Sequence, residues 1–154
     1  MTNRLHKLDK LFEENQIDAV ALVPGSNFNY LTGANFHLME RPTILLVKKD
    51  KSPIAILPSL EVDSFNTLNL DAEIISWKGN DGYIDALKKA SQIIGSIKKI
   101  GIEGQRMRFF ESEALQETFN NCEIVNAHTQ ISSIRLNKDS QEIEYLKKAI
   151  EKLI

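Results

Sequence analysis

Residues 19–27 read AVALVPGSN, and this stretch decides the fold class. Its first five residues are an apolar run of strand length, and the Pro-Gly-Ser-Asn that follows ends the run with turn residues. A strand without alternating polar residues is buried on both faces, as in sheets that helices cover on either side. Just upstream, apolar residues recur at helical spacing at Leu5, Leu8, Leu11 and Phe12. This periodicity predicts an amphipathic helix that ends near Asn15 and packs on the sheet.

The segments downstream of this strand predict a mixed α/β layer. Further strands are expected at residues 43–47, 54–57, 72–77, 99–103 and 123–125. The first two of these flank a polar loop of hairpin length, so they are expected to pair antiparallel. Helices are expected at residues 60–68, between Asp81 and Gly95, at residues 111–119 and after Asp139. Because helix and strand alternate in the second half of the chain, part of the sheet is predicted to be parallel.

Polar residues and one glycine mark the predicted helix ends. Ser59 and Asp81 are placed to act as N-caps, and Gly95 is placed to end a helix in a left-handed conformation. Asp139 and Glu142 have the spacing of a capping box. The helix that they open has an apolar stripe at Ile143, Leu146, Ile150 and Leu153. This stripe reaches the last residue without a terminating Gly, Asn or Pro, which predicts that the chain is cut from a longer protein.

Composition excludes several classes of function. The 154 residues are 42% hydrophobic, which is enough for the core of one domain. The formal net charge of −2 disfavours nucleic acid and anionic membrane surfaces as partners. No apolar run approaches the roughly 20 residues that span a bilayer, and the N-terminus lacks the apolar core of a signal peptide. The single cysteine, Cys122, is expected to be a buried structural thiol, and a cytoplasmic location is expected.

The motifs of common catalytic sites do not occur in this sequence. There is no HExxH, paired CxxC or H-x-H ladder, so no metal ligands and no catalytic residues are expected in this chain. The three histidines, His6, His37 and His128, are scattered. Residues 25–29 lack the second glycine of a nucleophile elbow, and the seven glycines form neither G-x-G-x-x-G nor a P-loop. These residues by themselves indicate an α/β domain without catalytic machinery.

Four short segments resemble the creatinase/prolidase N-terminal domain family. Residues 27–33 (NFNYLTG) resemble the family's N-x-x-YLTG signature, and residues 39–41 (MER) resemble the HER tripeptide of Xaa-Pro dipeptidases. Residues 57–62 (LPSLEV) resemble a PALEVE segment. Residues 134–144 (IRLNKDSQEIE) resemble the pattern R-x-x-K-s-x-x-E-I-E. The four segments occur in the family's order, on the predicted strands and helices, and are spread over nearly the whole chain.

The resemblance implies a fold and a place in a larger enzyme. The fold would be a three-layer α/β architecture with a roughly six-stranded mixed sheet flanked by helices, including a ribonuclease H-like motif. Residues 1–134 would form the N-terminal domain, and residues 135–154 a linker helix into an absent catalytic pita-bread domain. In such enzymes two divalent ions, often manganese, activate a hydroxide that attacks the Xaa-Pro bond. Their carboxylate and histidine ligands would all lie beyond Ile154.

The resemblance also implies what this domain does for the enzyme. It would contribute to a homodimer, contact its own catalytic domain and shape the access of proline-containing peptides to the active site. The candidate substrate-access loop is residues 34–41, with His37, Glu40 and Arg41 as site residues, because a guanidinium or imidazole there could pair with a substrate carboxylate. Met39 stands where the dipeptidases have the histidine of HER. The parent is therefore expected to be either a prolidase or an aminopeptidase P-like enzyme acting on longer Xaa-Pro peptides.

Simpler interpretations stand beside these roles. Glu40 and Arg41 could form a surface ion pair worth under about 1 kcal/mol. Tyr30 and Leu31 are expected to pack a short helix against the sheet instead of touching substrate. Arg135 could anchor the last helix or be solvated. For the whole chain, the alternatives are a stand-alone interaction module of the same fold, and a small-ligand domain of flavodoxin type, which the lack of phosphate-cradling glycines disfavours.

Overall fold

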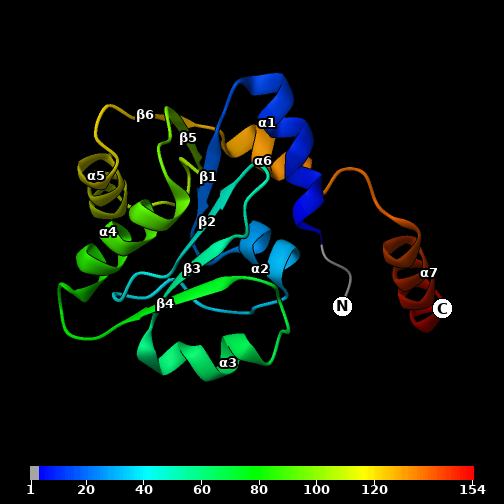
Figure 1. Ribbon diagram of the computed structural model, residues 1–154. Helices are drawn as coiled ribbons and strands as arrows, with labels where there is room; N and C mark the ends of the chain where they lie inside the picture. The colour runs from blue at the N-terminus through cyan, green and yellow to red at the C-terminus, as the bar shows by residue number, and fades with distance from the viewer. Residues whose placement is uncertain (1–3) are drawn as a thin grey trace.

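A six-stranded mixed sheet lies at the centre of the molecule, in the strand order β4-β3-β2-β1-β5-β6 (Figure 1). The computed structural model describes residues 4–154. The strands are β1 (Ala19–Leu22), β2 (Ile44–Lys48), β3 (Ile54–Pro58), β4 (Glu73–Trp77), β5 (Lys99–Ile102) and β6 (Glu123–Asn126). Each of them lies on a segment that the hydrophobic pattern predicted, with bounds that differ by at most one residue at either end.

The sheet is antiparallel on one side of β1 and parallel on the other. β1 pairs antiparallel with β2 and parallel with β5, so that Val20 lies between Val47 and Gly101. β2 and β3 form the predicted antiparallel hairpin, and β4 and β6 add parallel strands at the two edges. The prediction of a partly parallel sheet is therefore confirmed. One consequence is that the carboxyl ends of β1 and β5 reach the same edge of the sheet, where the loop before β2 also arrives.

Helices cover both faces of the sheet, which gives the three layers implied by the resemblance (Figure 1). The helical segments are η1 (Leu5–Leu8), α1 (Asp9–Asn15), α2 (Ser26–Thr32), η2 (Ser59–Glu61), α3 (Val62–Asn66), α4 (Gly82–Ile94), α5 (Phe109–Thr118), α6 (His128–Ser133) and α7 (Ser140–Leu153). On one face α4 and α5 pack through Ala19, Ala21, Ile44, Leu46, Leu87 and Leu115. On the other face α1, α2, α3 and α6 pack through Val20, Leu22, Leu11, Phe28, Phe65 and Ile131.

The β1 strand is buried on both of its faces, as its unbroken apolar run predicts. All four of its residues are fully buried, the two alanines toward α4 and α5 and the larger Val20 and Leu22 toward the α2 layer. Cys122 is also buried, as expected for a structural thiol, and burial raises the pKa of this thiol. Within residues 4–154, no helix is both long enough and apolar enough to cross a membrane.

At both ends of two predicted helices, the one from residue 60 to 68 and the one between Asp81 and Gly95, the structure differs in detail from the prediction. Ser59 does not cap a helix, because its hydroxyl donates to the carbonyl oxygen of Trp77 (3.0 Å) at the end of the neighbouring strand β4. The segment instead opens with the η2 turn, and α3 ends at Asn66 and not at residue 68. Asp81 occupies the predicted N-cap position of α4, but its side chain makes no capping hydrogen bond. Gly95 ends α4 with a positive φ of 81°, but its ψ of −166° lies outside the left-handed helical region.

The last helix begins at the predicted capping box. The Asp139 carboxylate accepts from the Glu142 amide (2.8 Å), and the Glu142 carboxylate accepts from the Asp139 amide (2.9 Å). From there α7 lies to one side of the sheet and its other helices, joined to α6 by a loop (Figure 1). Its apolar stripe is exposed, at Ile143, Leu146, Ile150 and Leu153. The predicted amphipathic helix is therefore present, and its apolar face has no cover among residues 4–154.

Glu142 attaches the start of α7 to η1 and α2. Its carboxylate accepts a hydrogen bond from the Tyr30 hydroxyl (3.1 Å), and it lies 3.5 Å from Lys7 Nζ and 3.8 Å from an Arg4 nitrogen. Lys7 also donates to the Tyr30 hydroxyl. Burial disfavours the charged form of Glu142, but the hydrogen bonds from Asp139 and Tyr30 and the two cations outweigh it and lower the pKa of Glu142 to about 2.

This shift predicts that acid weakens the attachment of α7. A carboxyl with a lowered folded-state pKa adds stability above its ordinary value of 4.5, and this contribution is lost as the pH falls from 4.5 through about 2. We therefore expect Glu142→Gln to speed hydrogen exchange of the first-turn amides of α7 at pH 7, and the difference from wild type to shrink toward pH 2. Glu144→Gln is the matched control, because its pair with Lys148 is exposed. If the difference in exchange rate between Glu142→Gln and wild type stays constant from pH 7 to pH 2, this account is contradicted.

Candidate functional site

The candidate site forms where the carboxyl ends of β1 and β5 meet the loop that leads into β2. After β1 the chain turns at Pro24 and Gly25 into α2, and α2 ends at Gly33 in the left-handed conformation that favours glycine (φ 79°). The Thr32 hydroxyl, which is buried, donates to the Phe28 carbonyl (2.7 Å) and accepts from the Ala34 amide (3.0 Å). The threonine and glycine of the NFNYLTG segment thus fix the root of the substrate-access loop, residues 34–41.

The three predicted site residues lie on this loop and are exposed. His37, Glu40 and Arg41 line a groove of about 730 Å³ between the loop, η2 and the start of α5. The apolar part of the groove comes from Phe36, Leu38, Met39, Pro58 and Leu60. In the part of the chain that the structure describes, Glu40 and Arg41 do not form the surface ion pair considered above. The guanidinium of Arg41 therefore has no carboxylate partner within the chain from residue 4 onward.

Arg108, which is not among the predicted site residues, ties the substrate-access loop to α5. One guanidinium nitrogen donates to the Met39 carbonyl (2.6 Å), and the other lies 2.6 Å from the carboxylate of Glu111. Glu111 is fully buried and also accepts from the backbone amide of Arg108 (2.9 Å), which closes the first turn of α5. The i, i+3 spacing of an arginine and a glutamate at a helix start was the available sequence signal.

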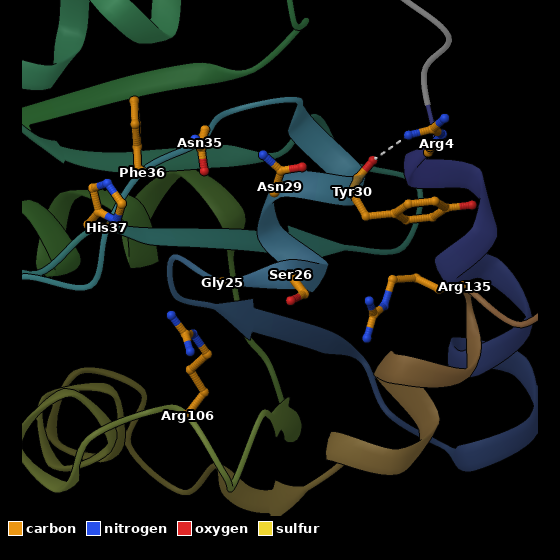
Figure 2. A pocket seen from close by; sticks show the side chains of 10 residues that line it. All are labelled: Arg4, Gly25, Ser26, Asn29, Tyr30, Asn35, Phe36, His37, Arg106 and Arg135. Carbon is orange, nitrogen blue, oxygen red and sulfur yellow. Dashed lines mark hydrogen bonds between the residues drawn. The ribbon is translucent and has the colours of Figure 1, made fainter. Parts of the chain in front are cut away.

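A second pocket, the arginine pocket, adjoins the groove and shares Phe36 and His37 with it (Figure 2). It has a volume of about 660 Å³ and is lined by Arg4, Gly25, Ser26, Asn29, Tyr30, Asn35, Phe36, His37, Arg106 and Arg135. Figure 2 shows Arg106 and Arg135 on either side of Ser26, each extending from a different segment. Arg135 is exposed and lines this pocket, so of the two roles considered for it the structure favours a solvated side chain.

A buried polar pair lies behind the arginine pocket. The amide of Asn27 donates to the carboxyl of Glu103 (3.2 Å) and to the hydroxyl of Ser132 (3.2 Å), and so joins α2, the end of β5 and α6. Both members of the pair are only 2% exposed. Burial raises the pKa of Glu103, while the hydrogen bond from Asn27 and the charges of His128, Arg106 and Arg135 oppose this rise. The hydrophobic pattern contained no signal for this pair.

The described residues offer no place for the metal ions that the resemblance implies. Among residues 4–154, no three His, Cys, Asp or Glu side chains come close enough together to hold an ion. The buried carboxyls, Glu103 and Glu111, are engaged with Asn27 and Arg108. The donor chemistry that two divalent ions require is therefore not assembled by these residues.

Comparison with known proteins agrees with this geometry. A family model described as Creatinase/Prolidase N-terminal domain matches residues 4–137. The chain belongs to this family. Relatives in several Staphylococcus aureus strains, described as uncharacterized peptidases, are 28% identical over 148 residues. The alignment covers 94% of this chain and 40% of the relatives, so the creatinase/prolidase domain spans well under half of their length.

Solved structures show the same fold. A recombinant prolidase from Thermococcus sibiricus is 25% identical with a TM-score of 0.82, and the match covers 98% of this chain and 41% of that one. The N-terminal domain of an Xaa-Pro dipeptidase from Lactobacillus brevis matches with a TM-score of 0.76 at 19% identity, over 84% of this chain and 98% of that domain. The three-layer mixed sheet implied by the resemblance is thus confirmed, and the second match shows that this fold forms as an isolated domain.

Proposed function

We propose that this creatinase/prolidase domain is the non-catalytic N-terminal part of a metal-dependent Xaa-Pro peptidase, either a prolidase or an aminopeptidase. The observation that carries the proposal is the coverage: the family match takes up residues 4–137, while the matched peptidases and the T. sibiricus prolidase are more than twice as long. The hydrolytic residues would lie in that additional length. The exposed apolar stripe of α7 supports this arrangement, because such a face is normally covered by further protein.

In this proposal, two divalent ions, often manganese in this family, would be held by the remainder of the protein. The ions would supply an activated hydroxide and polarise the carbonyl of the Xaa-Pro bond. The contribution of residues 4–154 would be to bind and orient the substrate. Their single cysteine and lack of a membrane-spanning helix are compatible with the cytoplasm as the place of action.

The substrate-access loop would act at the mouth of an active site, in a homodimer, on the catalytic part of the partner subunit. Support comes from the exposed side chains of His37, Glu40 and Arg41 in a groove whose floor is apolar. A guanidinium on such a groove can pair with the carboxylate of an Xaa-Pro dipeptide, while the proline ring packs on the apolar floor. Arg108 holds the loop in place through the Met39 carbonyl and is therefore a positioning residue.

Arg41→Ala in the longer protein tests this role. If Arg41 pairs with the dipeptide carboxylate, kcat/KM for an Xaa-Pro dipeptide is expected to fall about tenfold, which corresponds to one charge-assisted hydrogen bond. The value for a longer Xaa-Pro peptide should change little, because its carboxylate lies elsewhere. Arg41→Lys is the matched control that keeps the charge. An unchanged ratio between the two substrates would remove the role of Arg41, and no Xaa-Pro cleavage by the wild-type longer protein would refute the proposed function itself.

A further inference from the structure

The arginine pocket has a one-sided charge. Three arginines line it, from three separate segments: Arg4 before η1, Arg106 after β5 and Arg135 after α6. None of the residues that line it is an aspartate or a glutamate. Because guanidinium groups in one cavity repel each other, an arrangement of this kind is stabilised by a bound anion.

Two of the three guanidinium groups are available for a ligand. Arg4 is engaged, since it lies 4.0 Å from Asp139 and 3.8 Å from Glu142 and stacks over the Tyr30 ring. By contrast, Arg106 and Arg135 form no ion pair with any residue from 4 to 154. The charges of both arginines favour the ionised form of Glu103. The carboxyl of Glu103 is nevertheless buried, at 2% exposure, and is bonded to Asn27.

The turn after β1 is shaped to let Arg106 lie across it. The Nε of Arg106 donates to the carbonyl of Pro24 at the base of the turn, which leaves its two terminal nitrogens to face the pocket. A Cβ on Gly25 would lie 2.2 Å from that Nε, so any other residue there would displace the guanidinium. The hydroxyl of Ser26 lies between Arg106 and Arg135 in Figure 2. Two guanidinium forks and a hydroxyl that line one pocket match the oxygens of a phosphate or carboxylate.

We propose that Arg106, Arg135 and Ser26 form a binding site for a small oxyanion, a phosphate or a carboxylate group. The site lies on the opposite side of Phe36 and His37 from the groove that holds Glu40 and Arg41. It does not depend on the proposed peptidase function, because it rests only on residues of this chain. Two sources could supply the chemistry, namely free inorganic phosphate and the terminal carboxylate of a peptide.

Titration of the 154-residue chain with inorganic phosphate tests the site. At constant ionic strength, we expect saturable shifts of the backbone amide signals of Gly25 and Ser26 and of the Nε–H signal of Arg106. Arg106→Met and Arg135→Met should each raise the dissociation constant about tenfold, because each removes a charge-assisted contact. Gly25→Ala should weaken binding as well, although it keeps every charge. Circular dichroism of each variant shows whether the fold is retained; if Gly25→Ala is unfolded, the two Met variants decide the question.

Lys51→Met is the matched control, since it removes one exposed positive charge from the turn between β2 and β3, and Lys51 lines neither pocket. Its dissociation constant should equal that of wild type. Titrations with acetate and with glycyl-proline distinguish the two sources: tighter binding of phosphate supports free phosphate, and tighter binding of glycyl-proline supports a peptide terminus. Non-saturable shifts with all three ligands, or equal weakening of binding by Lys51→Met and Arg135→Met, would overturn the proposal.

Discussion

Replacing Arg108 with methionine is expected to lower the free energy of unfolding by about 2–3 kcal/mol. The reason is the burial of its partner: Glu111 is fully buried, and Arg108 lies 2.6 Å from its carboxylate. Methionine would keep much of the apolar stem of the side chain but leave a carboxylate without its cation in the core. The cost is that of an unpaired buried charge, which exceeds the net value of the original pair.

The same substitution should also loosen the substrate-access loop. Arg108 donates to the Met39 carbonyl, so its loss frees the loop from α5. Urea unfolding measures the first effect, and hydrogen exchange of the amides at residues 38–41 measures the second. Arg106→Met is the matched control, because Arg106 is exposed and has no buried acidic partner bonded to it. If both variants lose the same free energy of unfolding, the buried pair of Arg108 and Glu111 does not account for the loss.

The hydrophobic pattern predicts the sheet because burial of the strands leaves a direct mark on the sequence. The run at residues 19–23 has no polar residue, and in the structure β1 is buried on both faces at the centre of the sheet. The hairpin of β2 and β3 follows in the same way from two apolar runs around a polar loop. The local apolar runs and the burial that the whole sheet requires agree at these strands, which is why they could be predicted from the sequence.

The short helices were harder to predict because tertiary packing, not periodicity, forms them. The sequence predicts α2 only as a short helix without bounds at Tyr30 and Leu31, and it predicts no helix at residues 128–133, where α6 lies. Leu31 is buried against the sheet as expected, and Tyr30 is partly buried against the same core while its hydroxyl bonds to Glu142. Helices of seven and six residues are too short to be stable alone. Buried Asn27 and Thr32 also interrupt the apolar pattern that would reveal α2.

The substrate-access loop could be predicted from the sequence, but the arginine pocket could not. His37, Glu40 and Arg41 are close in sequence, so a single loop brings them to one groove. The arginine pocket instead gathers its three arginines from segments that are more than a hundred positions apart at the extremes. Only the strand order, which puts β1 beside β5, decides that these segments meet. Sequence spacing contains no information about that order when the intervening crossovers are long.

The most direct test of the central claim is a comparison of proline release by two proteins. The 154-residue chain and the longer protein proposed to contain it are each incubated with manganese and an Xaa-Pro dipeptide, and free proline is measured. We expect release by the longer protein and none above the background rate by the chain, because residues 4–154 assemble no metal site. Turnover by the chain alone would contradict the account, since the chemistry would then lie within the domain that we describe as non-catalytic.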